Sequence, residues 1–142
     1  MEIHQSAVIL LLVLCVSFSA HGQPEGYEHF LKQHVFGAMT VQKCDGEIHR
    51  RGIVRPQTTN GCKEKNTFIL ADKKHVNTVC GAAGTPEGIY RKSNNPFPMV
   101  ICKLHSGNTH PHCKYRGFTD TRKIVVRCED GWPVHYADDV IV

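Results

Sequence analysis

The stretch CKEKNTFI, Cys62 to Ile69, places a lysine directly after a cysteine and then continues as an apolar run that resembles a strand. Threonine, phenylalanine and isoleucine all favour extended backbone, so the second half of the stretch predicts a strand. An isolated lysine is usually a solvated surface residue. Whether Lys63 has a function therefore depends on what the rest of the chain can place beside it.

The chain is short, and its first part differs from the remainder. Its 142 residues are 41% hydrophobic and 21% charged, which suits one compact domain. Residues 1–22 contain no Lys or Arg, and they carry an apolar run from Ala7 to Val16 followed by small and polar residues. This layout predicts a secretory signal peptide. The alternative is a membrane anchor, but the apolar run is shorter than the roughly 20 apolar residues that a spanning helix needs. We expect a secreted mature protein that forms one domain over 23–142.

Export changes how the seven cysteines are interpreted. Cys15 lies in the apolar part of the signal segment, and an even number remains in the mature chain, where secretion permits disulfides. The alternative is a structural metal site, which the spacing disfavours because no two cysteines are as close as in a zinc knuckle. We expect three disulfides, with no metal and no cofactor, and the residues alone leave the pairing open. The six cysteines are Cys44, Cys62, Cys80, Cys102, Cys113 and Cys128.

The net charge of the mature chain indicates which kinds of molecule it would bind. All 17 Lys and Arg residues lie in 23–142, whereas one of the 13 acidic residues, Glu2, lies in the signal segment, so the mature net charge is +5. A secreted basic protein attracts polyanions such as nucleic acid, glycosaminoglycans or an anionic membrane surface. The alternative is that a mild positive charge serves only solubility.

The order of patterns along the chain predicts helices first and strands afterwards. Apolar residues recur at helical spacing from Pro24 to Ala38, with His34 on the apolar face. Asp72 is a plausible N-cap for a later helix. The remainder is rich in β-branched and aromatic residues broken by turn formers, as in long antiparallel strands. This order predicts an α+β domain. We expect helices over 24–38, 46–53 and 72–80, and strands over 90–107, 112–130 and 132–142.

Three residues far apart in the sequence have the right chemistry to cleave a ribose phosphodiester. That reaction needs a base for the 2′-hydroxyl proton, an acid for the leaving 5′-oxygen, and a cation for the charge that develops on phosphorus. Histidine suits both proton roles because its ordinary pKa lies near neutral pH. The candidates are His34, Lys63 and His135. Each alone is weak evidence, because a lone histidine on an apolar face is usually structural.

The local contexts of these residues carry a resemblance. Five segments occur in order, namely FLKQHV (30–35), CKEKNTF (62–68), CKLHSG (102–107), CKYR (113–116) and CEDGWPVHY (128–136). Together they resemble the pancreatic-type, or ribonuclease A, superfamily across essentially the whole mature chain. Within it, the six cysteines, the short connection from Cys128 to His135 and the segment IHRRGIVRP (48–56) are similar to the angiogenin branch and the related fish ribonucleases.

The resemblance implies a fold and a disulfide pairing. The implied fold is ribonuclease A-like, with three helices in the N-terminal half packed on a long curved antiparallel sheet. The implied disulfides are Cys44 with Cys102, Cys62 with Cys113, and Cys80 with Cys128.

The resemblance also implies a role for each site residue. His34 would be the general base and His135 the general acid, with Lys63 stabilising the transition state. Substrate-binding roles would fall to four further residues. Gln33 and the backbone at Tyr136 would hold phosphate oxygens, Thr67 would select a pyrimidine, and Glu129 would contact the next base.

Two segments depart from the family pattern. Where the family usually has an aspartate that orients the acid histidine, this chain has Ala137, followed by Asp138 and Asp139. Because a well-held tautomer is part of an efficient acid, we expect activity below that of a digestive pancreatic enzyme. The segment 81–90 does not match the cell-binding segment of angiogenin, which argues against angiogenic activity.

Arg50 and Arg51 resemble the angiogenin segment associated with nuclear import. The alternative is a solvated cationic face on the second predicted helix, because two arginines are thin evidence for an import signal. The resemblance therefore adds uptake and nuclear or nucleolar entry as an expectation.

The sequence thus supports two functions of different classes. The first is a secreted, metal-independent endoribonuclease that cleaves single-stranded RNA 3′ of pyrimidines through a 2′,3′-cyclic phosphate, with angiogenin-like or host-defence biology. The second is a cationic antimicrobial or receptor-binding protein whose action does not need catalysis. The expected partners are RNA, cell-surface polyanions, a receptor, anionic bacterial membranes and a ribonuclease inhibitor, and we expect a monomer.

Overall fold

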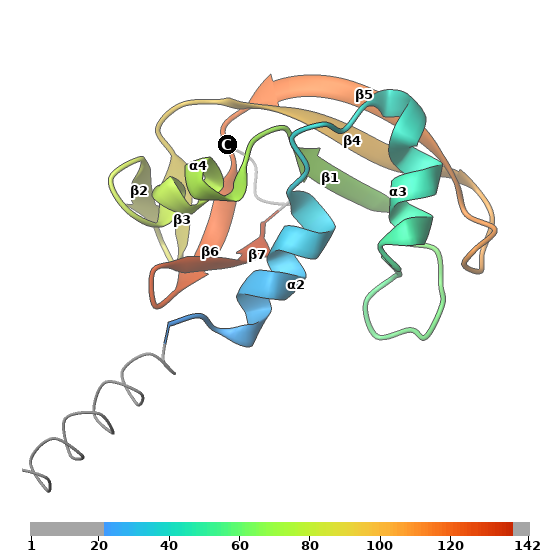
Figure 1. The fold of residues 1–142 in the computed structure, drawn as a ribbon, viewed down its shortest axis with the longest axis horizontal. Helices are drawn as coiled ribbons and strands as arrows, with labels where there is room; N and C mark the ends of the chain where they lie inside the picture. The colour runs from blue at the N-terminus through green and yellow to red at the C-terminus, as the bar shows by residue number, and fades with distance from the viewer. Residues whose placement is uncertain (1–21, 138–142) are drawn as a thin grey trace, which may run out of the picture.

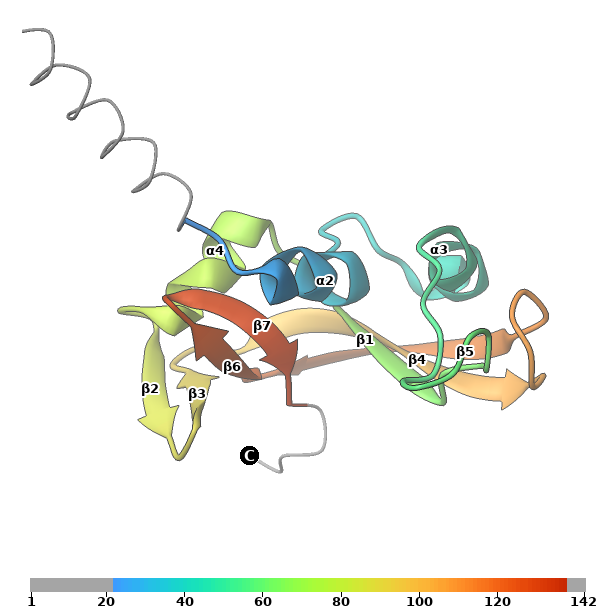
Figure 2. The same ribbon diagram turned by 90° about the horizontal axis from the view of Figure 1, so that it is seen from below.

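The computed structural model describes residues 22–137, so residues 1–21 of the predicted signal peptide, and Asp138 and Asp139, lie outside the described residues. The helices are α2 (Glu25–His34), α3 (Cys44–Arg50) and α4 (Lys73–Asn77), with short 3₁₀ turns η1 (Val41–Lys43) and η2 (Thr78–Cys80). The strands are β1 (Lys65–Ile69), β2 (Gly84–Glu87), β3 (Tyr90–Ser93), β4 (Phe97–Ser106), β5 (Lys114–Arg122), β6 (Val125–Glu129) and β7 (Trp132–Tyr136). The α+β class is confirmed, and Figure 2 shows the three helices in the upper part of that view, above β4 and β5.

The first helix is shorter than its apolar pattern suggests. It ends at His34 because Val35 takes an extended conformation, with φ −120° and ψ 114°. Val35 then forms an isolated parallel bridge with Ile69 at the end of β1. The prediction that the helix continues to Ala38 is wrong, since backbone pairing with the sheet replaces the last helical turn.

The second helix was predicted to reach Ile53, and this is also wrong. It ends at Arg50, and Gly52 follows with φ +63°, a left-handed conformation that glycine adopts without strain. The Gly52 N–H donates to His49 O at 3.0 Å and the Ile53 N–H donates to Ile48 O at 3.0 Å. This pair of bonds is a Schellman cap, and the two isoleucines pack in one core cluster beneath it.

The third helix begins where it was predicted. The side chain of Asp72 accepts a hydrogen bond from the His75 N–H at 2.8 Å, which satisfies a backbone donor that the helix cannot. The predicted segment to Cys80 divides into α4 and the 3₁₀ turn η2.

Each of the two long predicted strands breaks into two, and the breaks lie side by side. Ser93, at the end of β3, is buried, and its Oγ accepts a hydrogen bond from the N–H of Ile124, between β5 and β6. The Ser93 N–H donates in return to Ile124 O at 2.9 Å. The chain changes sheets at this contact. Instead of one long sheet, the strands form two antiparallel sheets, in the orders β1-β4-β5 and β2-β3-β6-β7 (Figure 1).

Two apolar clusters hold these layers together. One packs α2 and α4 against both sheets and includes Phe30, Ile69 and Tyr136. The other packs α3 against the sheet β1-β4-β5 and includes Ile48 and Phe68. Because β1 contributes alternate side chains to both clusters, its backbone is fixed on each face.

Three disulfides are formed, two of which connect a helical segment with a strand, and their pairing is the one that the resemblance implies. Cys44 in α3 is bonded to Cys102 in β4, Cys62 is bonded to Cys113, and Cys80 in η2 is bonded to Cys128 in β6. The Cys62–Cys113 bond fixes the backbone immediately before Lys63. Within residues 22–137 no helix is long and apolar enough to cross a membrane.

Candidate active site

A cleft of about 1150 Å³ lies between α2, the loop that follows α3, and β7. Of the predicted site residues, His34, Lys63, His135, Gln33 and Tyr136 line it. The fold therefore brings together the three residues that were predicted to meet only on folding. In the described part of the chain, no three His, Cys, Asp or Glu side chains are grouped to hold a metal ion.

His34 is held at the back of the cleft by a single hydrogen bond and two aromatic contacts. Its Nδ1 lies 2.8 Å from the backbone oxygen of Thr67 in β1. Its ring packs 5.7 Å from that of Phe30 and 5.1 Å from that of Tyr136. Because a carbonyl oxygen can only accept, Nδ1 must carry the proton, and Nε2 of the neutral ring then has a free lone pair. This is the tautomer that a general base needs.

The surroundings of His34 favour its neutral form. The residue is 9% exposed, and its pKa is lowered from 6.5 to about 3, chiefly by burial. The positive charge of Lys63 is the second cause of this decrease in pKa, whereas the hydrogen bond to Thr67 opposes it. At neutral pH the ring is thus unprotonated and ready to accept a proton.

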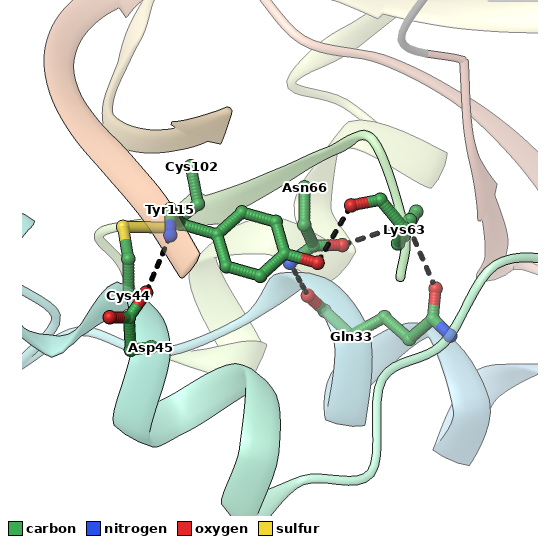
Figure 3. The surroundings of a disulfide bond; sticks show 7 residues. All are labelled: Gln33, Cys44, Asp45, Lys63, Asn66, Cys102 and Tyr115. Atoms are coloured by element: carbon green, nitrogen blue, oxygen red, sulfur yellow. Dashed lines mark hydrogen bonds between the residues drawn. A yellow bond between two sulfur atoms is a disulfide. The ribbon is translucent and has the colours of Figure 1, made fainter. Parts of the chain in front are cut away.

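Lys63 is positioned by a residue that the sequence reasoning missed. Its Nζ donates to Asn66 Oδ1 at 2.8 Å and to Gln33 Oε1 at 3.3 Å. The Asn66 amide also donates to the backbone oxygen of Gln33 at 2.9 Å, as Figure 3 shows. Asn66 therefore connects Lys63 to α2 beside His34. The signal for Asn66 was present, since asparagine is disfavoured in strands and this one, 1% exposed, is in the middle of the quoted stretch.

The backbone of Lys63 is held by a further hydrogen bond, which comes from β5. The hydroxyl of Tyr115 in β5 donates to Lys63 O at 2.7 Å, and the Tyr115 N–H donates to Asp45 Oδ1 at 2.6 Å (Figure 3). Burial raises the pKa of Tyr115 to about 12, so its hydroxyl remains a donor at every working pH. Asp45 follows Cys44, whose disulfide fixes that end of α3.

His135 enters the cleft from an edge strand. It is exposed on β7, and the pairing of β7 with β6 is shifted between Arg127 and Cys128. Such a bulge re-aims neighbouring side chains. Ala137, in the place of the family's usual aspartate, is buried, and its N–H donates to Val125 O at 2.9 Å.

The remaining predicted site residues have different surroundings. Thr67 is 1% exposed in β1, where its backbone oxygen holds His34. Glu129 is exposed at the end of β6, opposite Trp132, and is not among the described residues that line the cleft. Its contact with a second base stays a prediction.

Arg50 and Arg51 do not form a patch of two free cations. Both bind Glu47, with Arg50 Nη2 at 2.6 Å and Arg51 Nε at 2.9 Å from its Oε2. The Arg51 side chain is 13% exposed and also donates to Lys32 O at 2.9 Å. Arg51 therefore stabilises the fold, and nuclear import stays a prediction.

Comparison with known proteins places this geometry in a family. The family model described as pancreatic ribonuclease matches residues 25–137. The chain belongs to the pancreatic ribonuclease family. The chain is 50% identical to ribonuclease-like 3 of Danio rerio over all of both chains. It is 37% identical to angiogenin-4 of Mus musculus, over 94% of this chain and 92% of that one.

The solved structures that match the chain indicate the same family as the sequence relatives. The X-ray structure of zebrafish RNase5 is 53% identical in sequence and superposes with a TM-score of 0.78. That match covers 80% of this chain and 93% of the other chain. The resemblance to the ribonuclease A superfamily, with fish ribonucleases and angiogenins among the relatives, is confirmed.

Proposed function

We propose that the mature protein is a secreted, metal-independent endoribonuclease that cleaves single-stranded RNA 3′ of pyrimidines. One observation carries the proposal. A buried, neutral His34 has its Nδ1 committed to Thr67 O, and its other nitrogen is left for chemistry in the same cleft as Lys63 and His135. Family membership supports the same reaction class.

In the first step His34 acts as the base. Its Nε2 removes the proton of a ribose 2′-hydroxyl, and that oxygen attacks the adjacent phosphorus. His135 protonates the departing 5′-oxygen as the P–O bond breaks, which leaves a 2′,3′-cyclic phosphate. The Lys63 ammonium and the backbone N–H of Tyr136 stabilise the charge that builds on the phosphate oxygens.

In the second step water opens the cyclic phosphate and the two histidines exchange roles. His135, now neutral, removes a proton from the water, and His34, now charged, protonates the 2′-oxygen. The product is a 3′-phosphate, and both rings return to their starting forms. Thr67 is the residue for base choice, because its backbone and hydroxyl can pair with a pyrimidine edge.

A panel of dinucleotides tests the proposal. The mature wild type and His34→Ala, His135→Ala and Lys63→Ala would be assayed on UpA, CpA, ApA and GpA with and without EDTA. We expect chelator-resistant cleavage of UpA and CpA, and a loss of roughly 10²–10⁴-fold for each histidine variant. His112→Ala, which removes an exposed imidazole of the β4–β5 connection, is the matched control. Full activity in His135→Ala would overturn the mechanism.

A second function is favoured by an exposed aromatic ring and exposed basic side chains on β4 and β5. Phe118 is 48% exposed, with Lys103 Nζ 5.4 Å from its ring centroid, and Arg116 pairs with Lys103 in register. An exposed aromatic ring among cations suits an anionic bacterial membrane or cell-surface polyanion. We propose host-defence activity that does not need catalysis. If it is correct, His34→Ala keeps full bactericidal activity, and loss of killing in that variant would contradict it.

A further inference from the structure

The hairpin formed by β4 and β5 carries no acidic side chain over most of its length. From Lys103 to Phe118 the chain contains three histidines, two lysines and one arginine, and no Asp or Glu. The next acid along the chain, Asp120, is bound to Arg122. This part of the hairpin therefore combines fixed cations with imidazoles, whose charge depends on pH.

The histidines of the hairpin lie at one end of the molecule. His105 is on β4, and its Nε2 lies 3.5 Å from Arg116 Nη2 of β5. His110 and His112 are in the connection between the two strands, which lies beside α3 in both Figure 1 and Figure 2. A fourth imidazole, that of His49 in α3, stacks on His110 with the ring centroids 4.8 Å apart. All four are exposed except His110, which is half-buried.

The backbone of the connection is held in place. The His110 N–H donates to Asn60 O, in the loop after α3, at 2.6 Å. Gly107 has φ +103°, and a Cβ on it would clash with His112 O, so glycine is needed for the two sides of the connection to come this close. The hairpin histidines are thus gathered on a short, closed turn.

The elements packed against the hairpin, which are β1, α3 and η1, carry few acids. Asp45 of α3 accepts a hydrogen bond from the Tyr115 N–H, and Glu47 binds two arginines. Glu64, directly before β1, is exposed. Cations outnumber these acids, so an imidazole that gains a proton here adds to a positive surface. The cations of the hairpin and of the elements packed on it are Lys43, Arg50, Lys65, Lys103, Lys114 and Arg116.

An aromatic ring lies on the same hairpin. Phe118 of β5 is 48% exposed, and Lys103 Nζ is 5.4 Å from its ring centroid. At the surface of an anionic bilayer, such a ring can enter the interfacial layer while the cations contact lipid phosphates. A sulfated polysaccharide has no apolar layer in which to bury the ring. An anionic bilayer is therefore the partner that uses both the charge and the ring.

We propose that the β4–β5 hairpin is a docking surface for anionic membranes that binds more tightly in acid. Its three fixed cations increase to at most six when His105, His110 and His112 are protonated. A charged His49 opposes the protonation of His110, so six is the upper bound. The inference rests on the second proposed function and gives it a pH condition. It does not depend on catalysis, because no residue of the hairpin lines the cleft.

The test measures how the mature protein binds vesicles at pH 7.5 and at pH 5.5 at one ionic strength. The vesicles contain phosphatidylcholine alone or with phosphatidylglycerol, whose charge is constant over this range. Each cation near an anionic surface strengthens binding roughly fivefold. We expect the wild type to bind the anionic vesicles at least roughly tenfold more tightly at pH 5.5, and the neutral vesicles equally weakly at both pH values.

Four variants assign the effect to the hairpin. The triple change His105→Gln, His110→Gln and His112→Gln should lose most of the acid gain and keep the binding at pH 7.5. His105→Gln alone should lose up to roughly fivefold of the gain, whereas the matched control His75→Gln, which removes an exposed imidazole of α4, should keep it all. Phe118→Ser should weaken binding at both pH values and leave their ratio unchanged.

Equally tight binding of anionic vesicles at both pH values would overturn the inference, and so would a full acid gain in the triple variant. Either result leaves the second proposed function standing. An acid gain for heparin or single-stranded DNA without one for vesicles would also overturn it, since the partner would then be another polyanion. If no vesicle is bound at either pH, both the inference and a host-defence function at membranes are wrong.

Discussion

The burial of His34 predicts a specific acid sensitivity of the fold. Its pKa is lowered from 6.5 to about 3 in the native state, chiefly by burial and next by the charge of Lys63. Between these values the unfolded chain binds a proton at this position and the native chain does not. Stability therefore falls as the pH decreases from 6.5 towards 3, and the effect levels off below that range.

The size of the effect follows from the two pKa values. Each tenfold change in proton affinity corresponds to about 1.4 kcal/mol, so a decrease from 6.5 to about 3 amounts to on the order of 5 kcal/mol. This is a large fraction of the roughly 5–15 kcal/mol by which domains are typically stable. The pH-dependent change in the free energy of unfolding should therefore be large enough to measure.

His34→Asn isolates this contribution. The asparagine amide can still donate to Thr67 O, but it does not titrate. Urea unfolding of the disulfide-intact mature protein would be measured at several pH values from 7.5 to 3.5. The variant should be less stable near pH 7.5, because the imidazole loses its contacts with Phe30 and Tyr136. On acidification it should lose less free energy of unfolding than the wild type.

The quantity compared is the difference in free energy of unfolding between wild type and His34→Asn at each pH. The effect of protonating carboxylates that both proteins share therefore cancels. His112→Asn controls for the loss of one exposed imidazole. If the free energies of unfolding of wild type and His34→Asn run parallel from pH 7.5 to 3.5, the assignment of His34 as a buried neutral base is wrong.

Three further predictions concern the positioning of Lys63. Lys63→Ala should lower kcat by the equivalent of a few kcal/mol, roughly the cost of losing a transition-state contact. It should also move the acidic limb of the kcat/KM profile to higher pH, because the lysine charge lowers the pKa of His34. Asn66→Leu should cost roughly 1–3 kcal/mol in thermal unfolding, since Gln33 O loses its donor; unchanged stability and kcat would contradict this role. Tyr115→Phe should cost about 1 kcal/mol through the lost bond to Lys63 O, and a lower kcat at unchanged KM would identify it as a positioning residue.

The sequence predicted the parts of the fold that depend on local chemistry. Asp72 was identified as an N-cap because its carboxylate can satisfy a backbone donor three residues later, which is a local property. The end of α2 was missed because it depends on a contact beyond a local window, whereas the signal for the end of α3, a glycine just after the last helical turn, was local and was overlooked. Val35 leaves the helix to pair with β1, and Gly52 turns the chain so that Ile53 can be buried.

The difference between local sequence signals and long-range contacts also explains which site residues were predicted. His34, Lys63 and His135 were found because each lies in a segment that resembles a family motif. Asn66 and Tyr115 act through hydrogen bonds to residues far away in the sequence. An asparagine in a strand signals that Asn66 is unusual, but the sequence does not say which residue either side chain binds. The strand break at Ser93 was missed for the same reason, since its partner Ile124 lies in another strand.

Two of the disulfides lie where they support the site, and they help to offset the stability that the buried histidine costs in acid. A neutral His34 needs a dry pocket, and that pocket makes the native state less stable in acid. Two of the three bonds end next to residues that hold the site, because Cys62 precedes Lys63 and Cys44 precedes Asp45. Cross-links at these positions restrict the unfolded chain and fix the site backbone together. The fold can then keep a costly proton acceptor in the right tautomer without a large apolar core.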